Sequence, residues 1–343
     1  MGMLIWETSI LFLMAKELDF FQQNFLLFLC GQGVLAFNIM NIYVLNSKRC
    51  IEISKLFENY GLPWDAAGEE IHQLILQDIK KLKLIINILL MSMSIVHVTF
   101  LPFPDICQPF HKIAQEYFTK WTWLVDLTNI VALFLCGYNS SCFVCKITYS
   151  LRHLRIQIQL LNRLLNNINT RSRGDLKDEK YQMLLHEKLV YFMEAHQNTK
   201  KIYKTLSKRF GWILYPILIT SCFTGVAIIH KSLQRFEATG IMLQPREVFA
   251  YSLFGFNGYF LFDLGEQISR ESQKLLSNIY NCPWYRWNRK NKQVVLLFMT
   301  NCLEPMVFSF YGLMKLEYSN STKMAKICWS LLNILRNINN RNG

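Results

Sequence analysis

Three carboxylates lie inside or at the ends of long apolar runs, where an ionised side chain is costly. They are Asp126, Asp263 and Glu304. At the centre of a membrane helix each such charge costs about 2.5 to 3.5 kcal/mol on insertion scales, so these residues are usually paired or functional. We expect Asp126 and Asp263 to reach lipid headgroups or to pair with neighbouring helices. Glu304, directly before Pro305, is a candidate for pairing with a basic group across a subunit contact.

Catalytic and metal-binding motifs are missing from the sequence. There is no Gly-x-Ser-x-Gly, no phosphate-binding loop and no His-Glu-x-x-His, and the seven histidines are spread along the chain. Cys142 and Cys145 form a CxxC without a second pair, which indicates packed thiols rather than a metal site. His196 lies in an amphipathic segment, where helix packing is its usual role. We expect neither an enzyme nor a bound cofactor or metal.

The amino-acid composition indicates whether the chain is surrounded mainly by water or by lipid. The chain has 343 residues, of which 52% are hydrophobic and 14% aromatic, more than a soluble domain of this size usually carries. The net charge is +13, but the basic residues lie between the apolar runs instead of gathering on one polar face, which argues against nucleic-acid binding. The ten cysteines are scattered, several of them inside apolar runs, which argues against a secreted disulfide framework.

The apolar runs predict an all-α, polytopic bundle of transmembrane helices forming one domain over 1–343, since a span needs about 20 residues. The first run is too short to span and lacks the basic start and cleavage site of a signal peptide, so we expect a truncated first helix. The predicted spans are 3–15 (partial), 25–45, 82–103, 121–143, 210–229, 248–264 and 293–313, with a continuation at 319–338.

The longest polar stretch, 146–209, keeps the spacing of an amphipathic helix. Its apolar residues include Leu151, Leu154, Ile158, Leu161 and Leu165, and later Leu184, Leu189 and Phe192. This period predicts helices that continue beyond the membrane. The polar island at 166–180, which contains Arg171-Ser172-Arg173-Gly174, is the predicted break between them.

The distribution of Lys and Arg predicts the orientation. The segments 46–81, 144–209 and 265–292 contain 25 of the 37 basic residues. The segments that alternate with them contain six basic residues. These segments are 16–22, 102–117, 231–247 and 338–343. Basic segments stay in the cytoplasm, so a seven-helix chain would have a cytoplasmic N-terminus and an extracellular C-terminus.

A series of residues in the C-terminal part has a recognisable order and spacing. They are Gly265-Glu266, Ser272, the pair Tyr280 and Trp284 before a basic run, Pro305 and Gly312. This series resembles the C-terminal signature of the insect odorant receptors. A weaker match extends back through His196 and the Leu101-Pro102…Pro109 loop.

The resemblance implies a ligand-binding subunit in the plasma membrane of olfactory sensory neurons. It would bind small volatile organic molecules and join a shared odorant co-receptor in a heterotetrameric, non-selective cation channel. In this family the last crossing is broken, here between Pro305 and Gly312, and its final helix lines the pore. The family's Thr-Ser-Tyr-Ser run appears as Ile327-Cys328-Trp329-Ser330. The candidate pore and gating residues are Glu304, Pro305, Trp329, Ser330 and Leu332.

An odorant pocket should be apolar with a few polar groups. The alternation of spans places a set of aromatic and small polar residues in four helices, some of them at the outer ends. The candidate odorant-binding residues are Ser94, His97, Phe100, Trp123, Asn129, Phe223, Tyr251 and Phe254.

Two other interpretations of the sequence stay open at this point. The sister gustatory receptor family shares architecture and orientation, although its C-terminal Thr-Tyr…Gln-Phe signature is absent here. The chain could also be a non-conducting relic, because its first helix is short and its pore-helix motif is eroded.

Overall fold

The computed structural model describes residues 47–65, 68–100, 120, 122–171, 178–240, 245–310, 312 and 314–342. Within these ranges the chain is almost entirely helical, as the apolar periodicity predicts. The predicted spans 3–15 and 25–45 lie outside the described residues, and so does the 101–119 loop.

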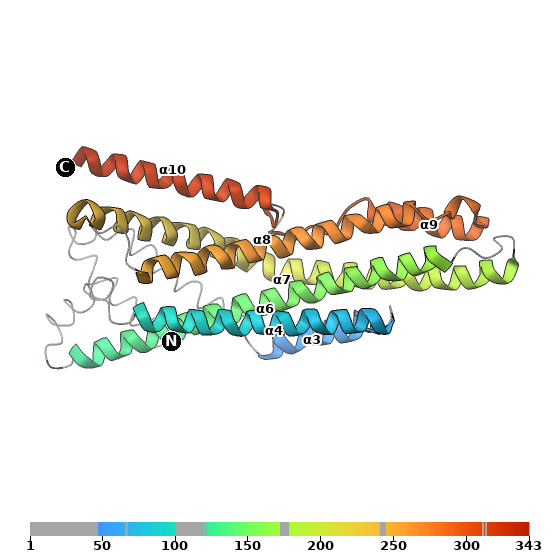
Figure 1. The fold of residues 1–343 in the computed structure, drawn as a ribbon, viewed down its shortest axis with the longest axis horizontal. Helices are drawn as coiled ribbons and strands as arrows, with labels where there is room; N and C mark the ends of the chain where they lie inside the picture. The colour runs from blue at the N-terminus through green and yellow to red at the C-terminus, as the bar shows by residue number, and fades with distance from the viewer. Residues whose placement is uncertain are drawn as a thin grey trace.

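Four long helices run roughly side by side along the long axis of the molecule (Figure 1). They are α4 (Glu69–Phe100), α6 (Thr122–Arg171), α7 (Glu179–Thr239) and α8 (Pro245–Tyr280). Helix α6 packs against the other three and α4 also packs against α8, while the shorter α3 (Ser47–Tyr60) packs on α7. The described residues of the predicted spans 82–103, 121–143, 210–229 and 248–264 are therefore helical.

The chain turns back after α8, so that α9 and α10 both run opposite to α8 (Figure 1). A 3-10 turn, η1 (Trp284–Arg286), leads into α9 (Arg289–Cys302), which packs on α7 and α8. A small antiparallel hairpin follows, in which β1 (Ser309–Phe310) pairs with β2 (Met314–Lys315). The last helix, α10 (Tyr318–Asn342), packs on α7 and α8.

The helices continue far beyond a bilayer thickness, as the 146–209 pattern predicts. Helix α6 has 50 residues and α7 has 61, which correspond to about 75 and 90 Å, against about 30 Å of hydrocarbon. Helix α7 starts at the N-cap Asp178, whose side chain accepts a hydrogen bond from the Lys180 N–H. It ends at Gly240, whose φ of 73° suits a residue without Cβ.

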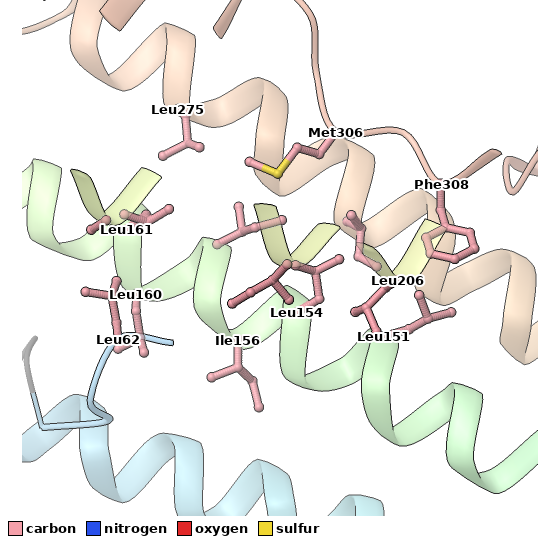
Figure 2. Packing of buried hydrophobic residues seen from close by; sticks show 14 of the residues in the cluster. Leu62, Leu151, Leu154, Ile156, Leu160, Leu161, Leu206, Leu275, Met306 and Phe308 are labelled. Atoms are coloured by element: carbon pink, nitrogen blue, oxygen red, sulfur yellow. The ribbon is translucent and has the colours of Figure 1, made fainter. Parts of the chain in front are cut away.

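The main core lies in the half of the bundle that contains the basic segments, called the polar half here: α6 after 144, α7 up to 209, α8 after 265, and α9. Its centre is a cluster of aliphatic side chains, several of them drawn in Figure 2, contributed by α6, α7, α8 and the chain after α9. The four leucines and one isoleucine predicted on the α6 stripe are all fully buried: Leu151, Leu154, Ile158, Leu161 and Leu165. This stripe is confirmed.

The stripe predicted at the start of α7 is one residue out of register at its first member. Leu189 and Phe192 are buried, but Leu184 is 50% exposed and Leu185 occupies the core instead. The spacing 185, 189, 192 keeps one helix face inward, whereas position 184 lies about 100° away from it.

The predicted span 293–313 is not a single helix, and the chain leaves the helix before the break expected between Pro305 and Gly312. Helix α9 ends at Cys302 and, with 14 residues, is shorter than the roughly 20 that a span needs. Pro305 disfavours a helical conformation at the residue before it and has no N–H to donate, so the helix ends before it, at Cys302. The apolar residues of this run are buried against protein instead, among them Val295, Phe298, Met306, Phe308 and Phe310. Hydropathy does not separate burial in protein from burial in lipid.

Among the helices that the structure describes, none is both long enough and apolar enough to be recognised as a membrane span from its hydropathy.

Candidate functional site

The segment between α9 and α10, residues 303–317 and called the connector here, lies in the bundle between α7 and α8. Phe308 and Phe310 are fully buried and Leu316 is 1% exposed. The connector carbonyls cannot bond within a helix, so they need partners from outside. The packing on both sides supplies them.

Helix α7 presents three donors to this region, at positions 200, 203 and 207 on one face. The bonds run from Lys200 Nζ to Asn301 O (3.2 Å), from Tyr203 Oη to Val307 O (2.7 Å) and from Ser207 Oγ to Ser309 O (3.2 Å). Spacings of three and four residues bring side chains to the same side of a helix. These donors satisfy carbonyls that the end of α9 and the hairpin leave free.

Helix α8 meets the connector through two signature residues. Ser272, 4% exposed, accepts a hydrogen bond from the Met306 N–H at 2.8 Å. Gly265 lies so close to Leu316 that an added Cβ would be 2.3 Å from the Leu316 Cβ and 2.4 Å from its carbonyl oxygen. Only a glycine allows the end of the hairpin to approach α8 this closely.

The remaining signature residues have different surroundings. Gly312 has φ of 72° in the hairpin turn, a conformation that favours glycine. Pro305 is half-buried in the connector. Trp284 packs against the core cluster, whereas Tyr280, at the end of α8, is 68% exposed. The signature therefore has one group of residues that seats the connector and one, Tyr280, on the surface.

The start of α10 rests on two carboxylates of α8. The Tyr318 hydroxyl donates to Asp263, and the Tyr318 N–H donates to Glu266 Oε2 at 3.4 Å. The Tyr318 ring also stacks on Tyr259, with centroids 6.0 Å apart. Negative charge next to the first turn of a helix is favourable because the helix dipole is positive there. Asp263 thus pairs with a neighbouring helix, one of the two roles expected for it.

The candidate pore and gating residues do not form one cluster. Glu304 was expected inside a span, and this is wrong: it is exposed in the bend after α9, before Pro305. Trp329 is 65% exposed on α10 and Ser330 is exposed beside it, with its hydroxyl bonded to the Lys326 carbonyl. Leu332 is 8% exposed. The α10 helix therefore presents Trp329 and Ser330 on an outer face of this chain.

The candidate odorant-binding residues are spread over the four long helices. Ser94, His97 and Phe100 lie on α4, Trp123 and Asn129 on α6, Phe223 on α7, and Tyr251 and Phe254 on α8. Among them, the surroundings of the side chain are described only for Trp123, which is 63% exposed.

His196 is a packing residue of the polar half. It is buried, its ring meets Phe298 edge to face with centroids 4.9 Å apart, and its Nε2 lies 3.7 Å from the Cys302 Sγ. Burial lowers its pKa to about 4, with a smaller contribution from the positive charge of Lys200. The imidazole is therefore neutral at neutral pH. No group of His, Cys, Asp and Glu in the described ranges is arranged to hold a metal ion.

Sequence reasoning missed the buried amides that join the helices of the polar half. Asn291 is fully buried, and its side-chain nitrogen donates to the backbone carbonyl and side chain of Gln182 at 3.0 and 2.9 Å. Gln157 closes a two-bond ring with the backbone of Leu62, at 2.6 and 3.2 Å. Polar residues on otherwise apolar helix faces were the available signal, but spacing does not identify their partners.

Comparison with known proteins identifies the class to which this bundle belongs. The family model described as 7tm Odorant receptor matches residues 69–328. The solved insect olfactory receptor OR5 from Machilis hrabei in complex with eugenol is 14% identical, with a TM-score of 0.60, and the alignment covers 91% of this chain and 81% of that one. Its structure described without eugenol is 13% identical, with a TM-score of 0.59 and the same coverage. No curated protein sequence matches at a significant level.

The chain therefore belongs to the odorant receptor family, a family of multi-pass membrane receptors, and it has the fold of the insect olfactory receptors. This is the same family whose C-terminal signature the sequence resembles.

Proposed function

We propose that this chain is an odorant receptor subunit that binds small volatile apolar molecules and, with a shared co-receptor, forms a ligand-gated, non-selective cation channel. It would work in the plasma membrane of olfactory sensory neurons. Membership of the odorant receptor family supports the receptor role. The eugenol complex of a receptor with the same fold supports a small, largely apolar ligand of this kind.

The single observation that carries the proposal is the set of contacts that hold the start of α10 on α8. Helix α10 is separated from α9 by the connector, and its first residue is held by Asp263 and Glu266 of α8. Tyr251 and Phe254, two of the candidate ligand contacts, lie on the same helix, nearer its start. A change in α8 caused by a ligand would therefore act directly on the base of α10.

Binding would draw mainly on burial of apolar surface, at roughly 25 cal/mol per Å². Opening requires that the ligand bind the open arrangement more tightly than the closed one, since equal affinity shifts no equilibrium. We assign the ligand contact to the eight candidate residues on α4, α6, α7 and α8, and conduction to α10, with Trp329 and Ser330 towards the ion path.

We place the polar half in the cytoplasm, with the C-terminus outside the cell. The basic segments support this orientation, and the polar half has the packed, apolar core of a soluble bundle. In this arrangement Glu304, exposed at the end of α9, is available to a basic group of another subunit.

The test is co-expression with the co-receptor in a non-sensory cell line, with calcium imaging and whole-cell recording against a panel of volatile odorants that includes eugenol. We expect odorant-evoked cation current with both chains and none with this chain alone. An epitope tag fused after Gly343 reports orientation, and it should be accessible to antibody on intact cells.

Two results would contradict the proposal. A large current from this chain without the co-receptor would refute the division of roles between subunits. No current from any odorant, despite normal surface delivery with the co-receptor, would favour the non-conducting relic. Leu332→Ser on α10 tests the assignment of roles: it places a hydroxyl at a buried site and should reduce current without changing the ligand that evokes it.

A further inference from the structure

A continuous series of polar contacts crosses four helices at the base of α10. Asp78 on α4 forms an ion pair with Arg152 on α6, with Oδ2 and Nη2 2.7 Å apart. Arg152 Nη1 donates to Gln267 Oε1 on α8 at 3.4 Å, and Gln267 Nε2 donates to Asp263 Oδ2 at 2.6 Å. The other oxygen of Asp263 accepts the Tyr318 hydroxyl of α10. Both ends of this series are carboxylate contacts, and Gln267 joins them.

The series lies in partly buried surroundings where electrostatic contacts keep much of their strength. The Arg152 side chain is 17% exposed and that of Asp78 is 36% exposed. Arg155, three residues further along α6, is also partly buried, and burial lowers its pKa, while Asp78, Glu271 and Asp263 act in the opposite direction. Arg152 is held by its ion pair with Asp78 and by its hydrogen bond to Gln267.

A second pair of contacts holds the same point of α10. Glu266 accepts the Tyr318 backbone N–H, and its other oxygen accepts from Arg270 Nε at 3.2 Å. The Arg270 guanidinium also lies 5.9 Å from the centre of the Tyr318 ring. Tyr318 is therefore bonded through its hydroxyl to one carboxylate and through its backbone to the next, one turn further along α8.

We propose that Asp78, Arg152, Gln267 and Asp263 form a side-chain relay that fixes the position of Tyr318, and that these are positioning residues for the gating of α10. The inference rests on the proposed channel function and adds to it the route by which α4 and α6 act on α10. Neither helix is among the main packing partners of α10, which are α7 and α8. The relay gives them influence through side chains instead.

The physical reason lies in the geometry of the middle residue. Gln267 donates with its nitrogen to Asp263 and accepts with its oxygen from Arg152, so a single amide orientation satisfies both neighbours. If Arg152 turns away towards another carboxylate, the amide loses one of its two bonds. Asp263 is then less firmly oriented, and the hydroxyl of Tyr318 loses its best acceptor. A movement at α4 thus reaches α10 without a change in the backbone between them.

The position of α10 can be measured without a ligand. Cys222 on α7 and Cys328 on α10 are free thiols in hydrogen-bonding contact. Copper phenanthroline with dissolved oxygen oxidises such a pair to a disulfide, and the two thiols give up two protons and two electrons to the oxygen. The rate of Cys222–Cys328 cross-linking in membranes, read by mass spectrometry of the linked peptides, reports how well α10 is seated. Cys328→Ser removes the signal and identifies it.

Two variants test the relay at two positions, Tyr318 and Gln267. Tyr318→Phe removes only the hydroxyl and keeps the ring on Tyr259. Gln267→Met keeps the side-chain length but removes both bonds of the relay. The matched control is Thr322→Val, which removes a hydroxyl from α10 whose hydrogen bond goes to its own helix, at the Tyr318 carbonyl.

We expect Tyr318→Phe and Gln267→Met each to slow cross-linking by about tenfold, because each removes a hydrogen bond to a charged group, while Thr322→Val leaves the rate unchanged. The double variant should be little slower than either single one, because both act on the same series of contacts. In whole cells, the first odorant found to be active should show a shifted concentration dependence in both single variants. Surface biotinylation confirms that each variant reaches the membrane.

Normal cross-linking in Gln267→Met would overturn the relay, and so would a double variant whose slowing equals the product of the two single effects. The two proposals fail in different ways. If cross-linking behaves as expected but no odorant evokes current, the relay stands and the channel function falls. If currents are evoked but Gln267→Met changes neither cross-linking nor concentration dependence, the channel function stands and the relay falls.

Discussion

Gly265 lies where α8 touches the end of the hairpin, and its replacement by alanine is the most direct test of how the connector is seated. The added methyl carbon would be 2.3 Å from the Leu316 Cβ and 2.4 Å from its carbonyl oxygen. Neither atom is the far end of a flexible side chain, so relief requires a shift of the backbone of the connector or of α8. The substitution therefore tests the packing of two main chains.

The magnitude follows from two opposing contributions. Alanine in place of glycine inside a helix is worth about 1 kcal/mol by helix propensity. Overpacking in a close-packed interior costs about 1 to 3 kcal/mol, and more where backbone has to move. We expect Gly265→Ala to lower the free energy of unfolding by up to about 2 kcal/mol, and by more if the backbone has to move, and to weaken the hold on α10. The melting temperature should fall by a few degrees.

Gly258→Ala on the same helix provides the matched control, since nothing lies within 4 Å of the Cβ it would add. It keeps the gain in helix propensity without the clash, so its melting temperature should be equal to or above that of the wild type. The assay is thermal unfolding of the detergent-purified protein, followed by fluorescence of its eight tryptophans. Equal melting temperatures for the two variants would refute the close approach of Leu316 to α8.

Three further predictions concern the polar half. Ser272→Ala leaves a buried backbone N–H without its acceptor and should cost about 1 to 3 kcal/mol in the same assay. Asn291→Leu removes the donor to Gln182 from a fully buried site and should cost at least as much. The third concerns pH: folding lowers the pKa of His196 from 6.5 to about 4, so the unfolded chain takes up the proton first. Its contribution to stability is complete above pH 6.5 and is lost as pH falls towards 4, by about 3 kcal/mol.

Each of these has its own control. Ser330→Ala removes a hydroxyl that bonds within α10, and a loss of stability as large as that of Ser272→Ala would argue against a special role for the connector contact. Asn301→Leu, at a half-buried site whose backbone carbonyl is the bonded group, tests whether any loss of an amide is harmful. For pH, the measurement is the difference between wild type and His196→Gln from pH 7 to 4. A constant difference would contradict the lowered pKa.

The sequence predicts the helices of this fold well because their period is strong. The α6 stripe from Leu151 to Leu165 repeats at three and four residues, and burying one face is the only arrangement that satisfies it. The error at Leu184 arises because two adjacent leucines start the α7 stripe, and the period alone does not say which one leads it. Burial in the core cluster decides for Leu185.

The run 293–313 shows where hydropathy stops being informative. Its apolar residues are as hydrophobic as those of a span, but they fill the space between α7 and α8 in three separate pieces. Pro305 and Gly312 were the local signals of a break, and they lie at the places where the chain bends and turns. The surrounding burial depends on Tyr203 and Ser272, which lie far away in the sequence.

The polar contacts at the base of α10 were beyond sequence reasoning for a similar reason. Asp263 stood out as a charge near an apolar run, but Tyr318 is 55 residues further along the chain. Arg152 and Asp78 are 74 residues apart, and neither belongs to a recognisable motif. Such pairs become visible only when the helices are in place.

The unbroken length of α7 has a mechanical consequence. A single helix of 61 residues extends from the basic part of the bundle to the apolar run at 210–229 and beyond it, without a break between Glu179 and Thr239. If it tilts by about 5° around its middle, each tip moves by about 4 Å in opposite directions. A ligand that displaces one tip of α7 would therefore displace the other tip, where neighbouring subunits would be in contact with it. Substitutions far from the ligand would then change the strength of the response.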